Sequence, residues 1–240
     1  MQRSKLALAA GIFGAVGLFD PGLGAALAHF GVLQPMGGFM LFGLGLLSAL
    51  IAGLLGLGAL YATRAGSNRS GRPLAWVGVA AAIAAIGVVA IARQPGAGVP
   101  QINDISTDLS DPPAFAGDPS GRGRDMSFPA GFADQIKATP AYQDLQPIRI
   151  ARAPADVLRE AEAAARALDW DVAGPDSANG TILASQTTKL FRFVDDIVVR
   201  VRDDGAGGSV VDVRSKSRDG KGDIGANAAR IRRFYEVLPK

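Results

Sequence analysis

Three long apolar stretches fill the first 92 residues of this 240-residue chain and restrict its fold more than any other feature. They run over about residues 6–30, 36–62 and 74–92. A helix of about 20 apolar residues crosses the ~30 Å hydrocarbon core of a bilayer, so each stretch predicts a transmembrane helix. We therefore expect residues 1–93 to form a membrane region of about three helices, with any water-exposed domain after it.

Basic residues at the ends of these stretches predict their orientation. Arg3 and Lys5 precede the first stretch, and Arg64, Arg69 and Arg72 lie between the second and the third. Neither Lys nor Arg occurs between the first and the second. Because cytoplasmic loops are enriched in Lys and Arg, the N-terminus and the second loop are predicted to be cytoplasmic. Three crossings then put everything after Arg93 outside the cytoplasm.

The first stretch leaves two alternatives open. Basic residues, an apolar run and then Ala26-Leu27-Ala28 also resemble a cleaved signal peptide, and cleavage would leave two spans with the same exported domain. Asp20 is followed by Pro21. A carboxylate inside a span often marks a function, whereas an Asp-Pro pair can sit in a kink or cap the second half of a broken helix. We expect a retained span and a structural role for Asp20.

Small residues recur at helical spacing in the second and third stretches. Gly45, Ala49 and Gly53 form one stripe, and Gly78 and Ala82 form another. Such stripes let helix backbones approach each other closely in lipid. We expect them to pack the three helices together; a homo-oligomer face is the alternative.

Charge and composition exclude several functions. Residues 1–92 carry a net charge of +4 and residues 93–240 a net charge of −1. A nucleic-acid-binding domain would itself carry the positive excess, so no nucleic-acid partner is expected. The chain has no Cys, and its one His, His29, lies in an apolar stretch. This composition excludes disulfides and thiolate nucleophiles and leaves almost no His chemistry. We predict neither a metal site nor a cofactor.

Residues 94–150 are predicted to form an extended, Pro-rich arm. Eight prolines between residues 94 and 147 exclude long helices. The segment also contains too many apolar residues, such as Ile105, Phe115 and Tyr142, to be a spacer. We expect it to lie across the following domain, with short turns and one helix near 130–137.

Residues 151–240 are predicted to form an α+β domain. An apolar stripe over 157–168 indicates a helix with one buried face. Alternating or apolar runs predict four strands, and a last helix begins near Ile224. The predicted strands are near 170–172, 181–185, 193–202 and 209–215. The order helix, four strands, helix favours an antiparallel four-stranded sheet flanked by helices.

A basic, Gly-rich motif closes this domain. Residues 214–240 carry a net charge of +5, whereas residues 151–213 carry −4. The motif could bind a phosphate or carboxylate at the start of the last helix, or its arginines could pair with acids of the arm and the sheet. We prefer the pairing. The candidate residues for either role are Arg214, Ser215, Ser217, Arg218, Lys221, Asn227 and Arg230, and the candidate acidic partners are Asp104, Asp108, Asp195, Asp196 and Asp212.

Three segments, PQINDISTDLSDPPAF, TTKLFRFVDDIVVRV and VDVRSKSRDGKGDIGANAARIRRF, resemble the bacterial and plastid family called domain of unknown function 1499. The resemblance spans about residues 99–238, and the apolar N-terminal stretches look like the membrane anchors of bacterial members. It implies the domain boundary and the membrane context but transfers no activity. The matching positions are Asn103, Asp104, Asp108, Pro112, Asp195, Asp196, Arg214, Ser215, Ser217, Arg218, Gly225, Asn227 and Arg230.

With the resemblance, these observations predict a multi-pass protein of the bacterial inner (plasma) membrane with a periplasmic C-terminal domain. They lead to three function hypotheses. The first is a non-enzymatic module displayed outside the cytoplasm, in contact with membrane lipid, that binds an envelope protein or supports a membrane complex. The second is a binder of an anionic small molecule or lipid headgroup through residues 214–230. An enzyme comes last, because Ser215 and Lys216 are neighbours on a strand and point to opposite faces. Asp195 and Asp196 are separated in the same way.

Overall fold

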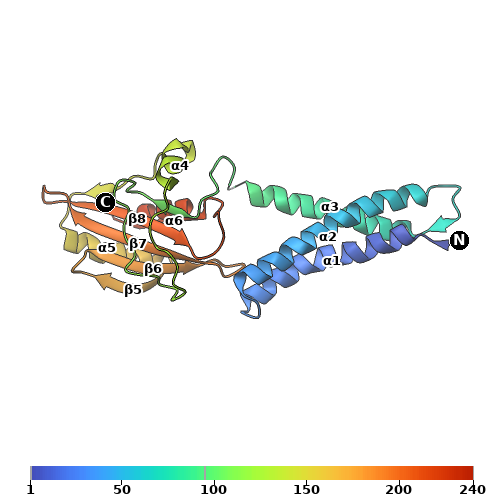
Figure 1. The fold of residues 1–240 in the computed structure, drawn as a ribbon, viewed down its shortest axis with the longest axis horizontal. Helices are drawn as coiled ribbons and strands as arrows, with labels where there is room; N and C mark the ends of the chain where they lie inside the picture. The colour runs from blue at the N-terminus through green and yellow to red at the C-terminus, as the bar shows by residue number, and fades with distance from the viewer. Residues whose placement is uncertain (1, 95, 240) are drawn as a thin grey trace. The chain divides into compact units, whose positions relative to one another are not determined.

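A computed structural model of the chain describes residues 2–94 and 96–239 (Figure 1). It divides into two compact units. The helical unit contains the residues up to Gln94 together with the short segment Lys189–Arg192. The sheet unit contains the remaining residues, so the arm and the predicted α+β domain form one body.

Three helices make up most of the helical unit: α1 (Lys5–His29), α2 (Pro35–Ala62) and α3 (Arg72–Arg93). All three are long and apolar enough to cross a membrane, and their ends lie within two residues of the predicted ones. Many of their large apolar side chains point outward; Phe19 and Leu54 are 75% and 73% exposed. Helices that are apolar on their outer surface are typical of proteins in lipid.

Helix α1 continues through Asp20 and Pro21. A cap for a second half-helix, one of the structural roles considered for Asp20, is therefore not formed. A Cβ added at Gly45 of α2 would lie 2.5 Å from Pro21 Cδ, so this glycine gives the proline ring room to pack.

The predicted stripes of small residues pack inside the helical unit. A Cβ added at Gly17 of α1 would lie 2.6 Å from Ala49 Cβ, and one added at Gly53 would lie 2.4 Å from Ala82 Cβ. Such close backbone approach requires small residues on both helices. The stripes therefore serve contacts among the three helices of one chain.

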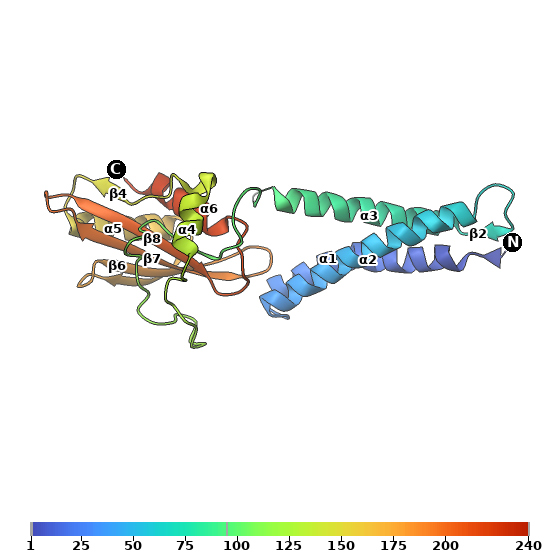
Figure 2. The same cartoon turned by 45° about the horizontal axis from the view of Figure 1, so that its top comes forward.

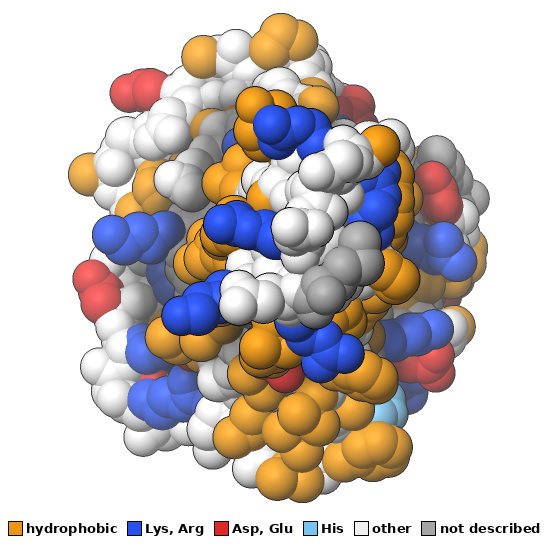
Figure 3. Space-filling view, turned by 90° about the vertical axis from the view of Figure 1, so that its right-hand side faces the viewer, with side chains coloured by type: hydrophobic (Ala, Val, Ile, Leu, Met, Phe, Trp, Pro, Cys, Tyr) orange, Lys and Arg blue, Asp and Glu red, His pale blue; other side chains and the backbone are white. Residues whose placement is uncertain are grey.

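One end of the helical unit gathers basic residues. A short strand β1 (Gln2–Arg3) pairs in parallel with β2 (Arg69–Ser70), which holds the N-terminus beside the loop between α2 and α3. Figure 3 shows Lys and Arg side chains around apolar ones at this end. The segment Lys189–Arg192 also belongs to this unit, where the Phe191 ring centroid lies 5.4 Å from those of Phe39 and Phe42.

The sheet unit is built on one antiparallel sheet of six strands, so the predicted α+β class is confirmed. Strands β5 to β8 correspond to the four predicted strands, and β3 and β4 come in addition from the arm. The order is β3-β8-β7-β6-β5, and β4 also pairs with β8, at the other end from β3. The bounds are β3 Asp104–Ser106, β4 Ile148–Ile150, β5 Asp171–Asp176, β6 Thr181–Thr187, β7 Val194–Asp203 and β8 Ser209–Ser217.

Two long helices cover one face of this sheet, and part of the arm crosses the other (Figures 1 and 2). Helix α5 (Pro154–Ala167) contacts β5, β6 and β7, and α6 (Ala226–Val237) contacts β3 and β8. The arm contains α4 (Phe132–Ala138), close to the predicted helix, and a short 3-10 helix, η1 (Pro140–Tyr142).

Strand alternation gives the two faces different chemistry. On the helix-side face, Val199 of β7 is paired with Val213 of β8, and both are buried in the apolar core. On the arm-side face, the next pair along the strands is Arg200 with Asp212. The arm covers this face, and Asp196 and Asp212 are fully buried there.

Candidate functional site

The Arg214 guanidinium is the most buried cation of the predicted motif. It lies on the arm-side face of β8 and is 2% exposed. Its Nε and Nη2 donate to the two carboxylate oxygens of Asp104 on β3, at 2.9 and 2.8 Å. Lys216, the register partner of Asp104, donates to the same carboxylate at 2.9 Å. This bidentate pairing fixes the first strand of the arm to β8.

The arm also closes over Arg214 from outside. Arg214 Nη1 donates to the Pro113 carbonyl oxygen at 3.2 Å, and Nη2 donates to the Met126 carbonyl oxygen at 2.9 Å. The rings of Phe115 and Phe128 lie 5.0 and 5.2 Å from the guanidinium carbon. Cation–π contact and hydrogen bonds together leave this arginine no free donor surface for a ligand.

Arg218 pairs with Asp196, one of the candidate acidic partners. Arg218 Nε and Nη2 donate to Asp196 Oδ1 at 3.0 and 2.7 Å. The other oxygen of Asp196 accepts from Arg124 in the arm, which sequence reasoning did not single out. Arg124 also pairs with Asp118, so a chain of alternating charges runs from β8 into the arm.

Asp108 and Asp212 pair with arginines outside the predicted motif. Arg200 and Arg202 of β7 both donate through Nε to Asp212 Oδ2, at 3.0 and 2.9 Å. Arg202 Nη2 also donates to Asp108 at 2.9 Å. The spacing of these two arginines on a predicted strand could have placed them on one face, because side chains alternate with a period of two.

The helix-side face holds a separate polar network at the start of β7. Arg230 of α6 donates to the carboxylate of Asp195, to Ser215 Oγ at 3.0 Å and to Asn227 Oδ1 at 2.6 Å. Asn227 Nδ2 donates to Ser217 Oγ at 3.0 Å. Ser215 and Ser217 lie on the same face of β8, and Asn227 and Arg230 are three residues apart on α6. Their hydrogen bonds join α6 to the sheet.

Lys221 is the one residue of the predicted motif outside both networks. It is exposed and forms no recorded ion pair among the described residues. The nearby Asp223 accepts from the backbone N–H groups of Gly225 and Asn227 at the start of α6. Burial raises the pKa of Asp223, although these hydrogen bonds oppose the rise.

Arm carboxylates on the other face shift in the opposite direction. Burial acts to raise the pKa of Asp108, but hydrogen bonds from Asp111 and Ser110 and the charge of Arg202 outweigh it and lower the pKa. The pKa of Asp118 is lowered in the same way, by hydrogen bonds from Arg124 and Ser120 that outweigh burial. These carboxylates are therefore ionised at neutral pH and hold the turns of the arm in place.

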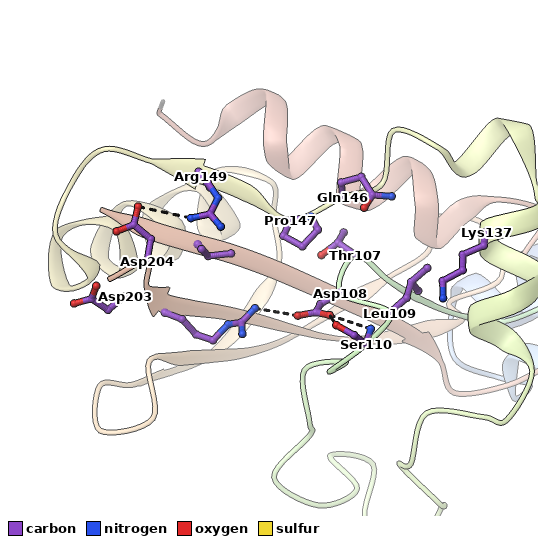
Figure 4. A pocket seen from close by; sticks show the side chains of 12 residues that line it. Thr107, Asp108, Leu109, Ser110, Lys137, Gln146, Pro147, Arg149, Asp203 and Asp204 are labelled. Atoms are coloured by element: carbon purple, nitrogen blue, oxygen red, sulfur yellow. Dashed lines mark hydrogen bonds and ion pairs between the residues drawn. The ribbon is translucent and has the colours of Figure 1, made fainter. Parts of the chain in front are cut away.

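A pocket of about 650 Å³ opens beside β4 and β8 (Figure 4). Its lining carries both signs of charge: Arg149 lies at one end with Asp203 and Asp204, and Lys137 lies at the other end beside Leu109. Arg149 lies 3.9 Å from Asp204 and is 72% exposed. The mixture of charges suits a polar protein surface better than a small anion.

The residues considered for catalysis in the sheet unit have other partners. Asp195 and Asp196 lie on opposite faces and accept from different arginines. Ser215 donates to Asn227 at 2.7 Å, and no His belongs to the sheet unit. In residues 2–94 and 96–239, no group of three or more His, Cys, Asp or Glu side chains could hold a metal ion.

These features define a class: an α+β domain with one charged, arm-covered sheet face, joined to three apolar helices of membrane length. The family model described as protein of unknown function (DUF1499) matches residues 104–238, more than half of the chain. The chain belongs to this family. The match begins at the first residue of β3, so it covers the sheet and α6 but none of α1 to α3. No curated protein matches the chain.

Proposed function

We propose that this chain is a multi-pass protein of the bacterial inner membrane that displays a non-enzymatic interaction domain outside the cytoplasm. The observation that carries this proposal is the internal pairing of the basic motif. Arg214, Arg218 and Arg230 each donate to a buried carboxylate of the same unit. An anion site built on this motif loses its donors, and the motif serves instead to hold the arm and α6 on the sheet.

The distribution of charge supports the proposed orientation. Five basic residues, Arg3, Lys5, Arg64, Arg69 and Arg72, lie at the start of α1 or around the loop from α2 to α3, whereas residues 30–34 at the opposite turn contain neither Lys nor Arg. Cytoplasmic loops carry such an excess. The sheet unit follows α3 and would then lie on the opposite side of the membrane.

Single cysteines test the orientation, because the chain has none of its own. Ala206→Cys, in the exposed turn between β7 and β8, should react with a membrane-impermeant maleimide in intact spheroplasts. Ala65→Cys, exposed between α2 and α3, is the matched control and should react only after lysis. The reverse pattern would overturn the proposed side of the membrane.

The pocket of Figure 4 is the surface on which we expect the protein partner to bind. Charge reversal at its rim, Lys137→Glu with Arg149→Glu, should release a stoichiometric partner that copurifies in mild detergent. Arg159→Glu with Arg166→Glu on the exposed side of α5 is the matched control and should retain the partner.

The variant Arg218→Ala distinguishes this proposal from the alternative function, binding of an anionic small molecule or lipid headgroup. If Arg218→Ala loses a bound anionic lipid but retains the protein partner, the alternative function is favoured.

A further inference from the structure

Asp20 is the one ionised side chain deep inside the three apolar helices. Residues 6–28, 35–62 and 73–92 contain no other Asp, Glu, Lys or Arg. Asp20 lies fifteen residues after the start of α1 at Lys5 and nine before its end at His29. At about 1.5 Å per residue, it is about 14 Å from the nearer end of the helix. Since the hydrocarbon core is ~30 Å thick, an α1 that spans the membrane carries this carboxylate well inside the lipid.

The carboxylate of Asp20 has no recorded partner among residues 2–94 and 96–239. Its side chain is half-buried beside Gly45 of α2, but it forms neither a recorded hydrogen bond nor a recorded ion pair there. The hydroxyl of Ser48, one turn farther along α2, donates instead to the Phe13 carbonyl oxygen at 2.9 Å. Charged groups inside a membrane pair with one another or with backbone groups. A cation for Asp20 must therefore come from outside this chain.

Pro21 places a second acceptor next to this carboxylate. Because proline has no N–H, the Gly17 carbonyl, four residues earlier, lacks the donor that an α-helix normally supplies. No water replaces that donor in the hydrocarbon core. Gly17 and Asp20 are three residues apart, so the two acceptors lie within one turn of α1. A neighbouring side chain with several N–H donors satisfies both.

The last two turns of α3 lack a packing partner at a similar depth. Residues 86–93 are all exposed, whereas Ala81 and Ala85 of the same helix are buried. Figures 1 and 2 both show this end of α3 separating from α1 and α2. The pairing of β1 with β2 holds the starts of α1 and α3 together, and Ala85 is thirteen residues from its start. From about the depth of Asp20 onward, α3 therefore offers an apolar face to another helix.

We propose that Asp20 is the contact point for a transmembrane helix of a second membrane protein, a helix that carries a Lys or Arg at the same depth. This cation donates to the Asp20 carboxylate and to the Gly17 carbonyl, and the exposed turns of α3 give the helix an apolar surface.

The chemistry favours this partner over the two other neighbours that a membrane supplies. A second copy of this chain brings another carboxylate and no cation within its spans. The cationic groups of lipids lie in the headgroup layer, outside the hydrocarbon core. The inference rests on the membrane insertion of α1 to α3 in the proposed function, but neither on their orientation nor on the pocket of Figure 4.

A model peptide tests the contact. The probe is a transmembrane helix of Leu and Ala, about 21 residues long, with one central Lys. The full-length chain, labelled at Ala65→Cys, and the labelled peptide are reconstituted together in phosphatidylcholine vesicles. Energy transfer should show several-fold tighter association for the Lys peptide than for the same peptide with Leu or Glu at that position. Equal association of the three peptides would overturn the proposal.

Variants of α1 and α2 then locate the contact. Asp20→Asn and Asp20→Leu should each abolish the preference for the Lys peptide, because neither has the carboxylate. Ser48→Ala, which removes a polar side chain of α2 and keeps Asp20, is the matched control and should retain the preference. A preference that persists in Asp20→Asn would refute the role of Asp20.

Thermal unfolding distinguishes this role from one inside the chain. A contact point for another protein contributes nothing to the folding of the chain alone, so Asp20→Leu in detergent should unfold at the same temperature as the wild type or higher. A lower Tm by circular dichroism would show that Asp20 holds the helical unit together and would overturn the proposal. Lys137→Glu with Arg149→Glu should leave peptide association unchanged, so a failure of the pocket as a partner surface is read separately.

Discussion

The two faces of the sheet are made by the same strands yet are held by different forces. On the helix-side face, residues such as Ile197, Val199 and Val213 are completely buried against α5 and α6. On the arm-side face, Arg214 and Asp104 are as deeply buried, but their partners are charges and backbone carbonyls of the arm. Apolar burial is non-directional, whereas these pairs require one arrangement of the arm. An irregular segment can thus be placed as exactly as a helix.

The largest effect is expected from Arg214→Met. Loss of the guanidinium leaves Asp104 with Lys216 alone and leaves the arm carbonyls without a donor. Breaking a buried pair costs about 3–5 kcal/mol, so the free energy of unfolding of the sheet unit should fall by about that amount. Chemical denaturation followed by circular dichroism, with the chain in detergent, measures it.

The double variant Arg214→Met with Asp104→Leu is the control for this prediction. It removes both buried charges, and Lys216 can turn toward water, so much of the lost stability should return. A loss below about 1 kcal/mol in the single variant would instead place Arg214 among surface ion pairs and contradict its role in holding the arm.

Low pH should destabilise the arm-side face of the sheet before the helix-side face. The pKa values of Asp108 and Asp118 are lowered from the ordinary 3.8, so their contribution to stability is complete above that value and is lost as pH falls through the folded-state pKa below it. Amides of the arm near Asp108 should lose hydrogen-exchange protection in this range before those of α5 and α6. Simultaneous loss of protection on both faces would show that carboxylates do not hold the arm.

The smallest effect is expected on the helix-side face. Ile197→Val removes one methylene from a fully buried side chain and should cost about 0.5–1.5 kcal/mol, independent of salt concentration. Arg166→Ala, which breaks an exposed i, i+4 pair with Glu162, is the control and should cost about 0.3–0.5 kcal/mol at low salt. A salt-dependent loss of stability in Ile197→Val would contradict the conclusion that apolar packing alone holds the helix-side face.

Periodicity explains which elements could be predicted from the sequence. The helices α1, α2, α3 and α5 and the strands β7 and β8 are long enough to show an apolar or alternating pattern. Strands β3 and β4 have three residues each, too few for a pattern, and they form because β8 offers a free edge. Their pairing is decided by distant residues that no local window contains.

The same limit applies to the candidate site. Composition indicated that Arg214, Arg218 and Arg230 would find acidic partners within the domain, but not which ones. Asp104 lies opposite Lys216 only because β3 pairs with β8 in one register. Arg124 and Asp118 lie in a loop without periodicity, so no local pattern distinguishes them from the other charged residues of the arm.

The edge of β8 has a consequence for the order in which the chain matures. Both β3 and β4 pair with this strand, and Arg214 is 110 residues away from Asp104 along the chain. The arm is synthesised before β8, so its strand β3 must wait, unpaired, while about 110 further residues are made. Long-range pairings of this kind close slowly. If the domain matures across a membrane, its final assembly can take place only on the far side, after the last strand has arrived.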